Sequence, residues 1–268
     1  MTGVPSDRHP ETWQPAYVFL DVQDSLIAWL VYRAELVSAP QIHERALSIW
    51  ATRHLRNMQT FHHEMALEQV RRAHFPDAVS RLTGFYAFPD RQAALAAARR
   101  WQVPSFREDL LAEVGIHPTA TVSRYDAEWI THHLGSPDSQ WMNDYFAGKP
   151  TADPIWELLI DGRALVFGKS LRETAYETVK AAWPRSLALL ELARVAAELN
   201  SDLGLITAML FTVGTNLEVR YAMNFIDATN PDFLQRFGEF QGPKNTNDLT
   251  PDSDLVQPDL TGRFFTLS

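Results

Sequence analysis

The stretch DPIWELLIDGRALVFG, residues 153–168, decides the predicted fold because it reads as two short strands around one turn. Pro154 and Gly168 bound it, and the apolar run between them is too short and too punctuated for a helix. The dipeptide Asp161-Gly162 suits a two-residue type I′ turn, since both central positions tolerate positive φ. We therefore expect a β-hairpin over this stretch.

Glu157 places a charge inside the first of these two apolar strands. Strand alternation puts it on the face of Ile155 and Leu159, and counting outward from the turn pairs it with Val166. An unpaired charge on a buried face is costly. Two interpretations stay open: Glu157 lies on a solvated face or pairs with an arginine, or it lies at a cleft rim where a strand fixes a carboxylate for chemistry.

The composition is that of a globular protein, with 46% hydrophobic and 11% aromatic residues in 268 positions. Cysteine is absent, which excludes disulfides, thiol nucleophiles and thiolate metal sites. No apolar run approaches the roughly 20 residues that span a bilayer. The opening MTGVPSDRHPETWQP does not have the pattern of a secretory signal. We expect a cytoplasmic protein with no membrane partner.

The net charge of −9 argues against a general nucleic-acid binder, but the charges are unevenly placed. Residues 43–107 contain ten Arg, no Lys and five acids, whereas residues 225–260 contain seven acids against Arg236 and Lys244. The arginine excess fits ordinary helix surfaces. The alternative is a local pocket for a phosphate-bearing ligand, because arginine binds phosphate with two parallel hydrogen bonds.

The N-terminal part mixes strand and helix patterns. Strands are expected over 17–22, 82–88 and 119–125, with helices over 40–74 (one long helix or two joined) and 90–101. Asp90 is the expected N-cap of the last of these helices. Residues 138–154 are expected to be a loop.

The C-terminal part is expected to be mainly helical. Residues 170–200 predict two helices broken at Pro184. Residues 205–214 predict a buried strand or helix, and residues 242–255 predict an exposed acidic loop. We therefore divide the chain into a core over 1–170 and a C-terminal part over 171–268 that packs on it.

Two stretches carry a resemblance to a known family. SRLTGFYAFPDRQAALAAARRW, residues 80–101, followed by PIWELLIDGRALV, residues 154–166, resembles the ADP-ribosyltransferase-like fold, especially its divergent bacterial and phage members. The resemblance spans roughly residues 15–170. It implies an α+β fold with a small split sheet, long N-terminal helices and a helical C-terminal part.

The resemblance also implies a site. Glu157 would be the catalytic carboxylate that contacts the NAD ribose, and Arg81, Tyr86 and Trp129 would bind NAD around its nicotinamide ring. NAD would serve as co-substrate, without a metal. The other interpretation makes Tyr86 and Trp129 core residues and Arg81 a surface ion-pair partner.

The sequence departs from the family in two places. The early strand over 17–22 offers neither the His nor the Arg that the family uses there, and Arg33 and His43 are the nearest candidates. Members that modify arginine carry Glu or Gln two residues before the catalytic Glu. Ile155 stands at that position, so arginine as acceptor is not supported.

Three further motifs lead to weaker hypotheses. HHEMALE, residues 62–68, has Leu67 where a zinc helix needs histidine, and solvated histidines are expected there. FGKS, residues 167–170, has Arg163 where a P-loop needs glycine. Asp126 fits either a substrate-orienting carboxylate or an N-cap for a helix through Trp129.

Together these patterns lead to a functional hypothesis of NAD-dependent ADP-ribosyl transfer, a glycosyltransferase reaction, or of NAD glycohydrolysis. The acceptor stays open among protein, nucleic acid, small molecule and water. The alternative is a non-enzymatic binding protein that uses its C-terminal helices, with Glu157 in a structural role.

Overall fold

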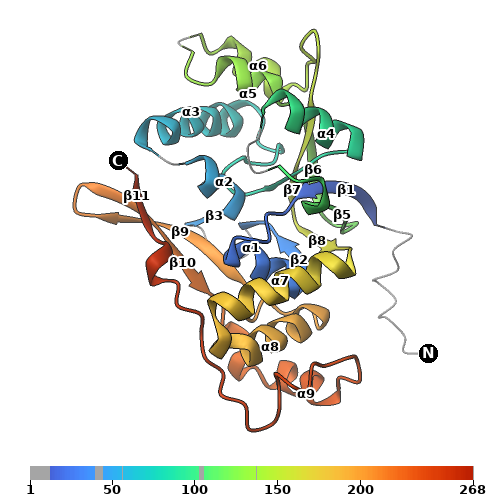
Figure 1. The fold of residues 1–268 in the computed structure, drawn as a ribbon. Helices are drawn as coiled ribbons and strands as arrows, with labels where there is room; N and C mark the ends of the chain where they lie inside the picture. The colour runs from blue at the N-terminus through green and yellow to red at the C-terminus, as the bar shows by residue number, and fades with distance from the viewer. Residues whose placement is uncertain (1–12, 40–44, 56, 103–105, 137, 268) are drawn as a thin grey trace.

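The computed structural model describes residues 13–39, 45–55, 57–102, 106–136 and 138–267. They form a mixed α+β molecule with three small antiparallel sheets (Figure 1). The expected α+β class is therefore confirmed. No helix within these ranges is long and apolar enough to cross a membrane.

Two of the sheets meet edge to edge. The first has the order β1–β5–β8–β2 and the second the order β4–β7–β6. An isolated bridge joins edge strands β1 and β4, with Tyr17 N donating to Phe88 O (2.9 Å) and Phe88 N donating to Tyr17 O (2.7 Å). The strands are β1 (Gln14–Phe19), β2 (Glu35–Val37), β4 (Phe85–Ala87), β5 (Leu111–Ile116), β6 (Thr121–Asp126), β7 (Trp156–Asp161) and β8 (Arg163–Val166).

Strands β7 and β8 follow one another in the chain but belong to different sheets, so the predicted hairpin is wrong. β7 pairs with β4 and β6, and β8 pairs with β2 and β5. Gly162, at φ +147°, carries the chain from one sheet to the other, and a Cβ there would lie 2.5 Å from the Cβ of Ala120. Glu157 consequently lies opposite Tyr125 rather than Val166.

The third sheet joins a short strand of the N-terminal part to three strands of the C-terminal part. It has the order β11 (Phe265–Leu267), β10 (Asn216–Met223), β9 (Ile206–Val213) and β3 (Ala46–Leu47). β9 shows that the strand alternative for residues 205–214 is right. The C-terminal part therefore contributes a hairpin as well as helices, and the hairpin projects to the left in Figure 1.

Most helices begin and end where the sequence pattern changes. Asp90 caps α4 by accepting a hydrogen bond from Ala93 N, as expected. Pro184 separates α7 from α8, also as expected. The long helical pattern becomes α2 and α3, while residues 40–44 lie outside the described ranges. The helices are α1 (Ser25–Arg33), α2 (Ile49–His54), α3 (Met58–His74), α4 (Arg91–Arg100), α5 (Glu128–His133), α6 (Gln140–Phe146), α7 (Lys169–Ala182), α8 (Leu187–Glu198) and α9 (Pro231–Glu239).

The expected loop over 138–154 contains helix α6, so that prediction is wrong. Trp141, Met142, Tyr145 and Phe146 bury one face of this helix. Their i, i+4 spacing is the helical signal, but it covers only two turns and is enclosed by proline and aspartate. Packing against neighbouring elements therefore stabilises a helix too short to form alone.

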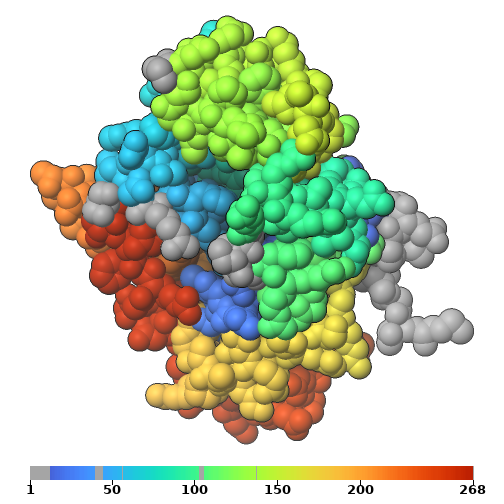
Figure 2. Space-filling model, turned by 45° about the horizontal axis from the view of Figure 1, so that its top comes forward, coloured from blue at the N-terminus to red at the C-terminus, as the bar shows by residue number. Residues whose placement is uncertain are grey.

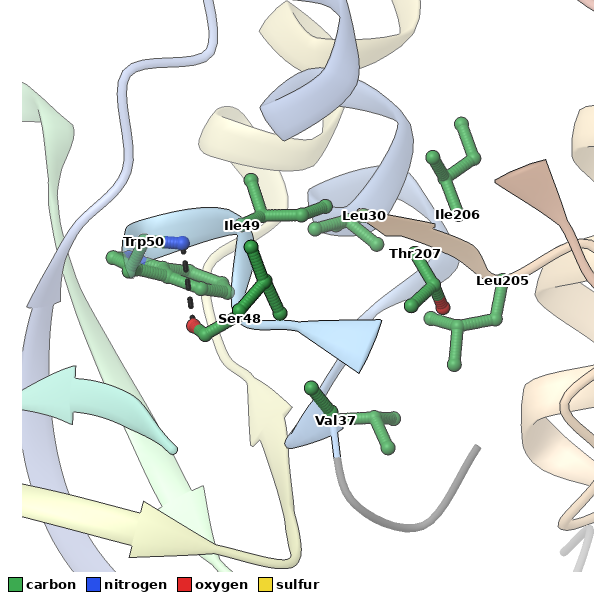
Figure 3. A pocket seen from close by; sticks show the side chains of 10 residues that line it. Leu30, Val37, Ser48, Ile49, Trp50, Leu205, Ile206 and Thr207 are labelled. Carbon is green, nitrogen blue, oxygen red and sulfur yellow. Dashed lines mark hydrogen bonds between the residues drawn. The ribbon is translucent and has the colours of Figure 1, made fainter. Parts of the chain in front are cut away.

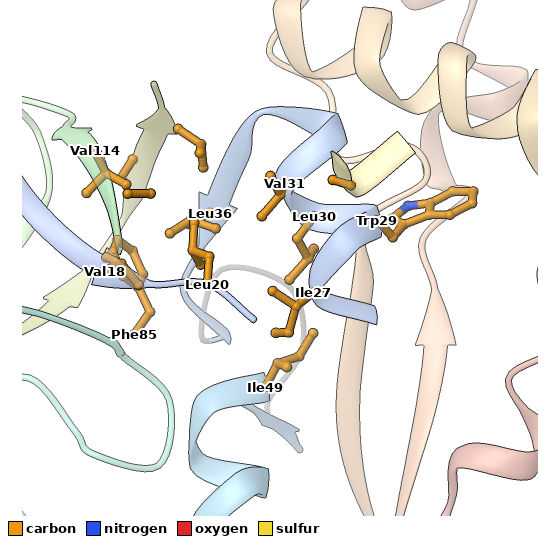
Figure 4. Close-up of a cluster of buried hydrophobic side chains, with 14 of the residues drawn as sticks. Val18, Leu20, Ile27, Trp29, Leu30, Val31, Leu36, Ile49, Phe85 and Val114 are labelled. Carbon is orange, nitrogen blue, oxygen red and sulfur yellow. The ribbon is translucent and has the colours of Figure 1, made fainter. Parts of the chain in front are cut away.

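The main hydrophobic core lies between the strands of the first two sheets and helices α1, α7 and α8. Figure 4 shows Val18 and Val114 on the strand side and Ile27 and Leu30 on α1. A separate cluster packs the other face of β7 against α3 and α6. Figure 2 shows α6 and α7 toward opposite ends of the molecule. β7 is therefore covered on both faces, which explains its nearly continuous apolar sequence.

Candidate functional site

Glu157 lies near the start of β7, the central strand of the second sheet. Leu158 and Ile160 on one face join the main core, and Leu159 on the other joins the cluster under α3 and α6. Alternation places Glu157 on the same face as Leu159. Its residue surface is 6% exposed, so a charged group is held in an almost fully buried position.

Arg81, just before β4, is the first partner of this carboxylate. Its Nη1 donates to Glu157 Oε1 at 3.0 Å. Its Nε and Nη2 donate to Glu64 of α3, at 3.1 Å to Oε2 and 3.2 Å to Oε1. Arg81 thus lies between two buried carboxylates and is itself 8% exposed.

Tyr145 of α6 is the second partner. Its hydroxyl donates to Glu157 Oε1 at 2.8 Å and accepts from Arg81 Nη1 at 3.1 Å. Both donors therefore use the same carboxylate oxygen. Across the described ranges, Oε2 of Glu157 accepts no hydrogen bond, and the side chain keeps 8% of its surface exposed. One oxygen thus has two donors, and the other has none among the described residues.

Tyr86 of β4 completes the wall of the cluster. Its hydroxyl donates to the Arg81 carbonyl oxygen at 2.8 Å, and its ring centroid lies 5.2 Å from the Arg81 guanidinium carbon. The exposed His54 ring approaches Tyr86 edge-on at 5.9 Å. Tyr86 is only partly buried, so it connects the buried cluster with the surface near α2.

Two carboxylates share one guanidinium in this cluster, which leaves a surplus of negative charge when both are ionised. Burial raises the pKa of Glu157, and Glu64 and Asp126 add to this, against the opposing effects of Arg81 and Tyr145. Burial disfavours the Arg81 cation, but Glu64 and its other neighbours outweigh burial and keep the pKa of Arg81 well above its usual value.

The two tyrosines of the cluster keep their protons. Burial raises the pKa of both Tyr86 and Tyr145. Tyr145 therefore remains a neutral hydrogen-bond donor to Glu157 at neutral pH.

The structure brings Arg81 and Tyr86 together with Glu157, but it places Trp129 elsewhere. Trp129 lies on α5, where its Nε1 donates to the Lys149 carbonyl at 2.7 Å and its ring lies tilted against His133, with ring centroids 5.4 Å apart. The predicted role of Trp129 as an NAD contact therefore has no direct geometric support.

The candidates for the missing early-strand residue give no replacement. Arg33 is fully buried in α1 and pairs with Glu35, so its side chain is not exposed to a ligand. His43 lies outside the described residues. The described ranges hold no group of three or more His, Cys, Asp or Glu side chains placed to bind a metal ion.

Glu64 and Tyr145 are the site residues that the sequence did not indicate. Glu64 stands in the HHEMALE stretch, where the histidines form the recognisable pattern. Tyr145 stands in the stretch expected to be a loop. Its apolar spacing with Trp141 was the available signal for a helix, but nothing in the sequence connects that helix to Glu157.

Three hollows elsewhere have walls that do not include Glu157. The first, between Leu30, Ile49 and Ile206, has a volume of about 10 Å³, room for about one water molecule (Figure 3). An open groove of about 760 Å³ beside β10 lies in the C-terminal part. A second, of about 630 Å³ beside α7, is lined by both parts of the chain, with Tyr32 and Val166 on one side and Tyr176 and Asn245 on the other.

Comparison with protein families places most of the N-terminal part in a family. Residues 32–177, more than half of the chain, match a family described as "Protein of unknown function (DUF2441)". The chain belongs to this family, and the matched residues include Glu64, Arg81, Tyr145 and Glu157. A search of curated proteins finds no match.

Proposed function

We propose that the protein cleaves NAD at the bond between ribose and nicotinamide, and passes the ADP-ribosyl group to an acceptor or to water. Glu157 is the catalytic carboxylate of this reaction. The fold proposed is the ADP-ribosyltransferase-like one, with its sheet split in two.

The arrangement of the first two sheets supports this fold. Their edge strands β1 and β4 lie side by side. Only the Tyr17–Phe88 bridge joins them, so the two sheets resemble one sheet that is split between β1 and β4. Glu157 lies beside this split, because its neighbour Leu158 is paired with Ala87, the residue before Phe88.

The observation that carries the proposal is the asymmetry of the Glu157 carboxylate. Arg81 and Tyr145 hold Oε1, and among the residues described here no donor occupies Oε2. Oε2 does not belong to the fully buried atoms that lack a partner, so it lies on the part of the side chain that stays exposed. A carboxylate fixed through one oxygen with the other open is preorganised to accept a hydrogen bond from a substrate hydroxyl.

The charge of the cluster suits NAD cleavage. Breaking the ribose C1′–nitrogen bond leaves its electron pair on nicotinamide and creates an oxocarbenium-like centre at C1′, as in glycoside cleavage. Glu157 Oε2 accepts from a ribose hydroxyl and opposes the positive charge. The acceptor oxygen then bonds to C1′ and releases its proton to solvent. The surplus negative charge of Glu64 and Glu157 also favours the cationic pyridinium of the substrate.

The other two cluster residues take supporting roles. Arg81 is engaged by Glu64, Glu157 and Tyr145, so a pyrophosphate contact for it finds no support in this geometry. Its role is to keep the Glu157 carboxylate charged and oriented. Tyr86, partly exposed beside the cluster, offers an aromatic face for the nicotinamide ring.

The test is an NAD titration followed by nicotinamide release, with wild-type protein and Glu157→Gln. Gln keeps the side-chain volume and an acceptor oxygen but loses the charge. We expect wild-type release and a loss of about 10²–10³-fold in the variant. Wild-type protein that neither binds NAD nor releases nicotinamide would overturn the proposal.

A binding-only function is the second candidate. The observations that favour it are the pairing of Glu157 with Arg81 and the two open grooves beside β10 and α7, which would serve a partner. On that account Glu157 is structural, and NAD has no effect on the protein.

A further inference from the structure

Asp126, the last residue of β6, is fully buried and satisfied entirely by backbone groups. Its Oδ1 accepts from Glu128 N at 3.1 Å and Ile155 N at 2.9 Å, and its Oδ2 accepts from Thr151 N at 2.7 Å. None of the described cations forms an ion pair with it. One carboxylate therefore accepts hydrogen bonds from three backbone N–H groups at separate points of the chain.

These donors mark the two ends of the connection between β6 and β7. Glu128 opens helix α5, and Thr151 and Ile155 lie on the return path after α6. Asp126 is also paired in register with Trp156, the first residue of β7. Both ends of the connection that contains α5 and α6 are thus hydrogen-bonded to the last residue of β6.

The same tie sets the relative positions of Tyr145 and Glu157. Tyr145 lies on α6 within the connection, and Ile155 lies two residues before Glu157. The N-cap of α5 is Ala127, which has no side-chain cap, so the N-cap alternative for Asp126 is wrong, although Asp126 accepts from Glu128 N. The contacts with Thr151 and Ile155 are additional, and they hold the part of the chain that leads from Tyr145 to Glu157.

We propose that Asp126 is a positioning residue, which fixes α6 on β7 so that the Tyr145 hydroxyl holds Glu157 Oε1 and leaves Oε2 open to substrate. The inference rests on the proposed function of Glu157. It goes beyond it by assigning the orientation of the carboxylate to a group that touches neither Glu157 nor a ligand.

The first test is the kinetics of nicotinamide release by Asp126→Asn. Asn keeps the Oδ1 acceptor but turns an amide group toward Thr151 N–H, so one bond is lost and two donors face each other. A displacement of about 1 Å in a catalytic group costs about 10²-fold in rate. We expect kcat to fall by about that factor with the KM for NAD unchanged. An Asp126→Asn variant that loses stability but keeps the wild-type kcat would overturn the proposal.

A double variant tests the route through Tyr145. If Asp126 acts by placing this hydroxyl, Asp126→Asn combined with Tyr145→Phe is no slower than Tyr145→Phe alone. Additive losses would contradict the route. Asp126→Glu keeps the charge but moves it by one methylene, so it should lose kcat as the Asn variant does. If Asp126→Asn does not fold, Asp126→Glu replaces it in this test.

An activity-independent measurement separates this inference from the proposed function. Titration of the Glu157 carboxyl by NMR reports the Tyr145 hydrogen bond, which lowers the pKa of Glu157, and the charge of Asp126, which raises it. Loss of positioning in Asp126→Asn raises that pKa, as Tyr145→Phe does, whereas loss of charge alone lowers it. The other charged and titratable groups around Glu157 are Glu64 of α3, Arg81 before β4, Tyr86 of β4 and Tyr125 of β6.

The two failures then look different. A raised Glu157 pKa in Asp126→Asn supports the positioning role even if wild-type protein releases no nicotinamide, which would refute only the proposed reaction. A lowered pKa in Asp126→Asn overturns the positioning role whatever the activity.

Discussion

Two buried glutamates, Glu68 and Glu157, differ in how their oxygens are used. Glu68 lies on α3 and is 5% exposed, nearly the same as Glu157 at 6%. Its Oε1 accepts from Arg71 Nη2 (2.9 Å) and Arg72 Nε (2.7 Å), and its Oε2 from Arg71 Nε (2.8 Å) and Ser80 Oγ (2.7 Å). Glu157 has two donors, both on one oxygen.

The pKa values of the two carboxyls shift in opposite directions. At Glu68, burial acts to raise the pKa but the hydrogen bonds from Arg71, Ser80 and Arg72 outweigh it, so the pKa is lowered. At Glu157, burial prevails and the pKa is raised. Nearly equal solvent exposure therefore accompanies two different arrangements: a carboxylate with donors on both oxygens that joins α3 to the following loop, and one with donors on a single oxygen.

The largest effect is expected from Arg81→Met. This change leaves Glu64 and Glu157 buried without a cation, which costs about 3–5 kcal/mol of unfolding free energy. Denaturant unfolding measures it, with Arg72→Met as control. The Arg72 side chain is 71% exposed, and its loss should cost less than about 1 kcal/mol. Equal costs for the two variants would contradict a buried, shared guanidinium.

Glu68→Gln should be the next most destabilising change. It replaces charge-assisted hydrogen bonds and turns an amide donor toward a guanidinium, at a cost of about 1.5–3 kcal/mol. Glu157→Gln should cost less than about 1 kcal/mol, because Arg81 keeps Glu64 and the Gln oxygen still accepts from Tyr145. Chemical denaturation of both variants checks the order. A reversed order would make Glu157 the structural glutamate.

The pH dependence of stability should differ in sign between the two glutamates. The folded pKa of Glu157 is raised, so its contribution is fully present below its ordinary value of 4.5 and is lost as pH rises through the raised value. The folded pKa of Glu68 is lowered, so its contribution is present above 4.5 and is lost as pH falls through the lowered value. Unfolding free energies of wild type and the two Gln variants across this range measure the difference, and slopes of the same sign would contradict it.

The smallest effect on NAD binding is expected from Trp129→Phe. This change removes the hydrogen bond to the Lys149 carbonyl and should cost about 0.5–1.5 kcal/mol of stability. Because Trp129 does not contact Glu157, the KM for NAD should not change. A marked rise in KM would restore Trp129 as an NAD contact.

The sequence indicated where the strands of the site lie better than it indicated which strands they pair with. Glu157 stood out because a charge interrupts an apolar strand, and strand alternation placed it on the face of Leu159, which packs under α3 and α6. Asp161-Gly162 gave a correct change of direction but a wrong hairpin, because the close approach to Ala120 and the pairing with β2 and β5 are non-local.

The residues around Glu157 were likewise predictable only where the sequence carried a local signal. Arg81 and Tyr86 came from the order of segments, and both lie beside Glu157. Tyr145 and Glu64 were missed because their link to Glu157 exists only once α6 and α3 pack on one face of β7. No spacing in the chain records that contact.

The most direct test of the central claim is nicotinamide release from NAD by wild type, Glu157→Gln and Glu68→Gln, measured per folded molecule at a temperature where all three are folded. The account predicts that Glu157→Gln loses about 10²–10³-fold in rate while Glu68→Gln retains the wild-type rate. Equal losses in the two variants, or wild-type turnover by Glu157→Gln, would contradict it.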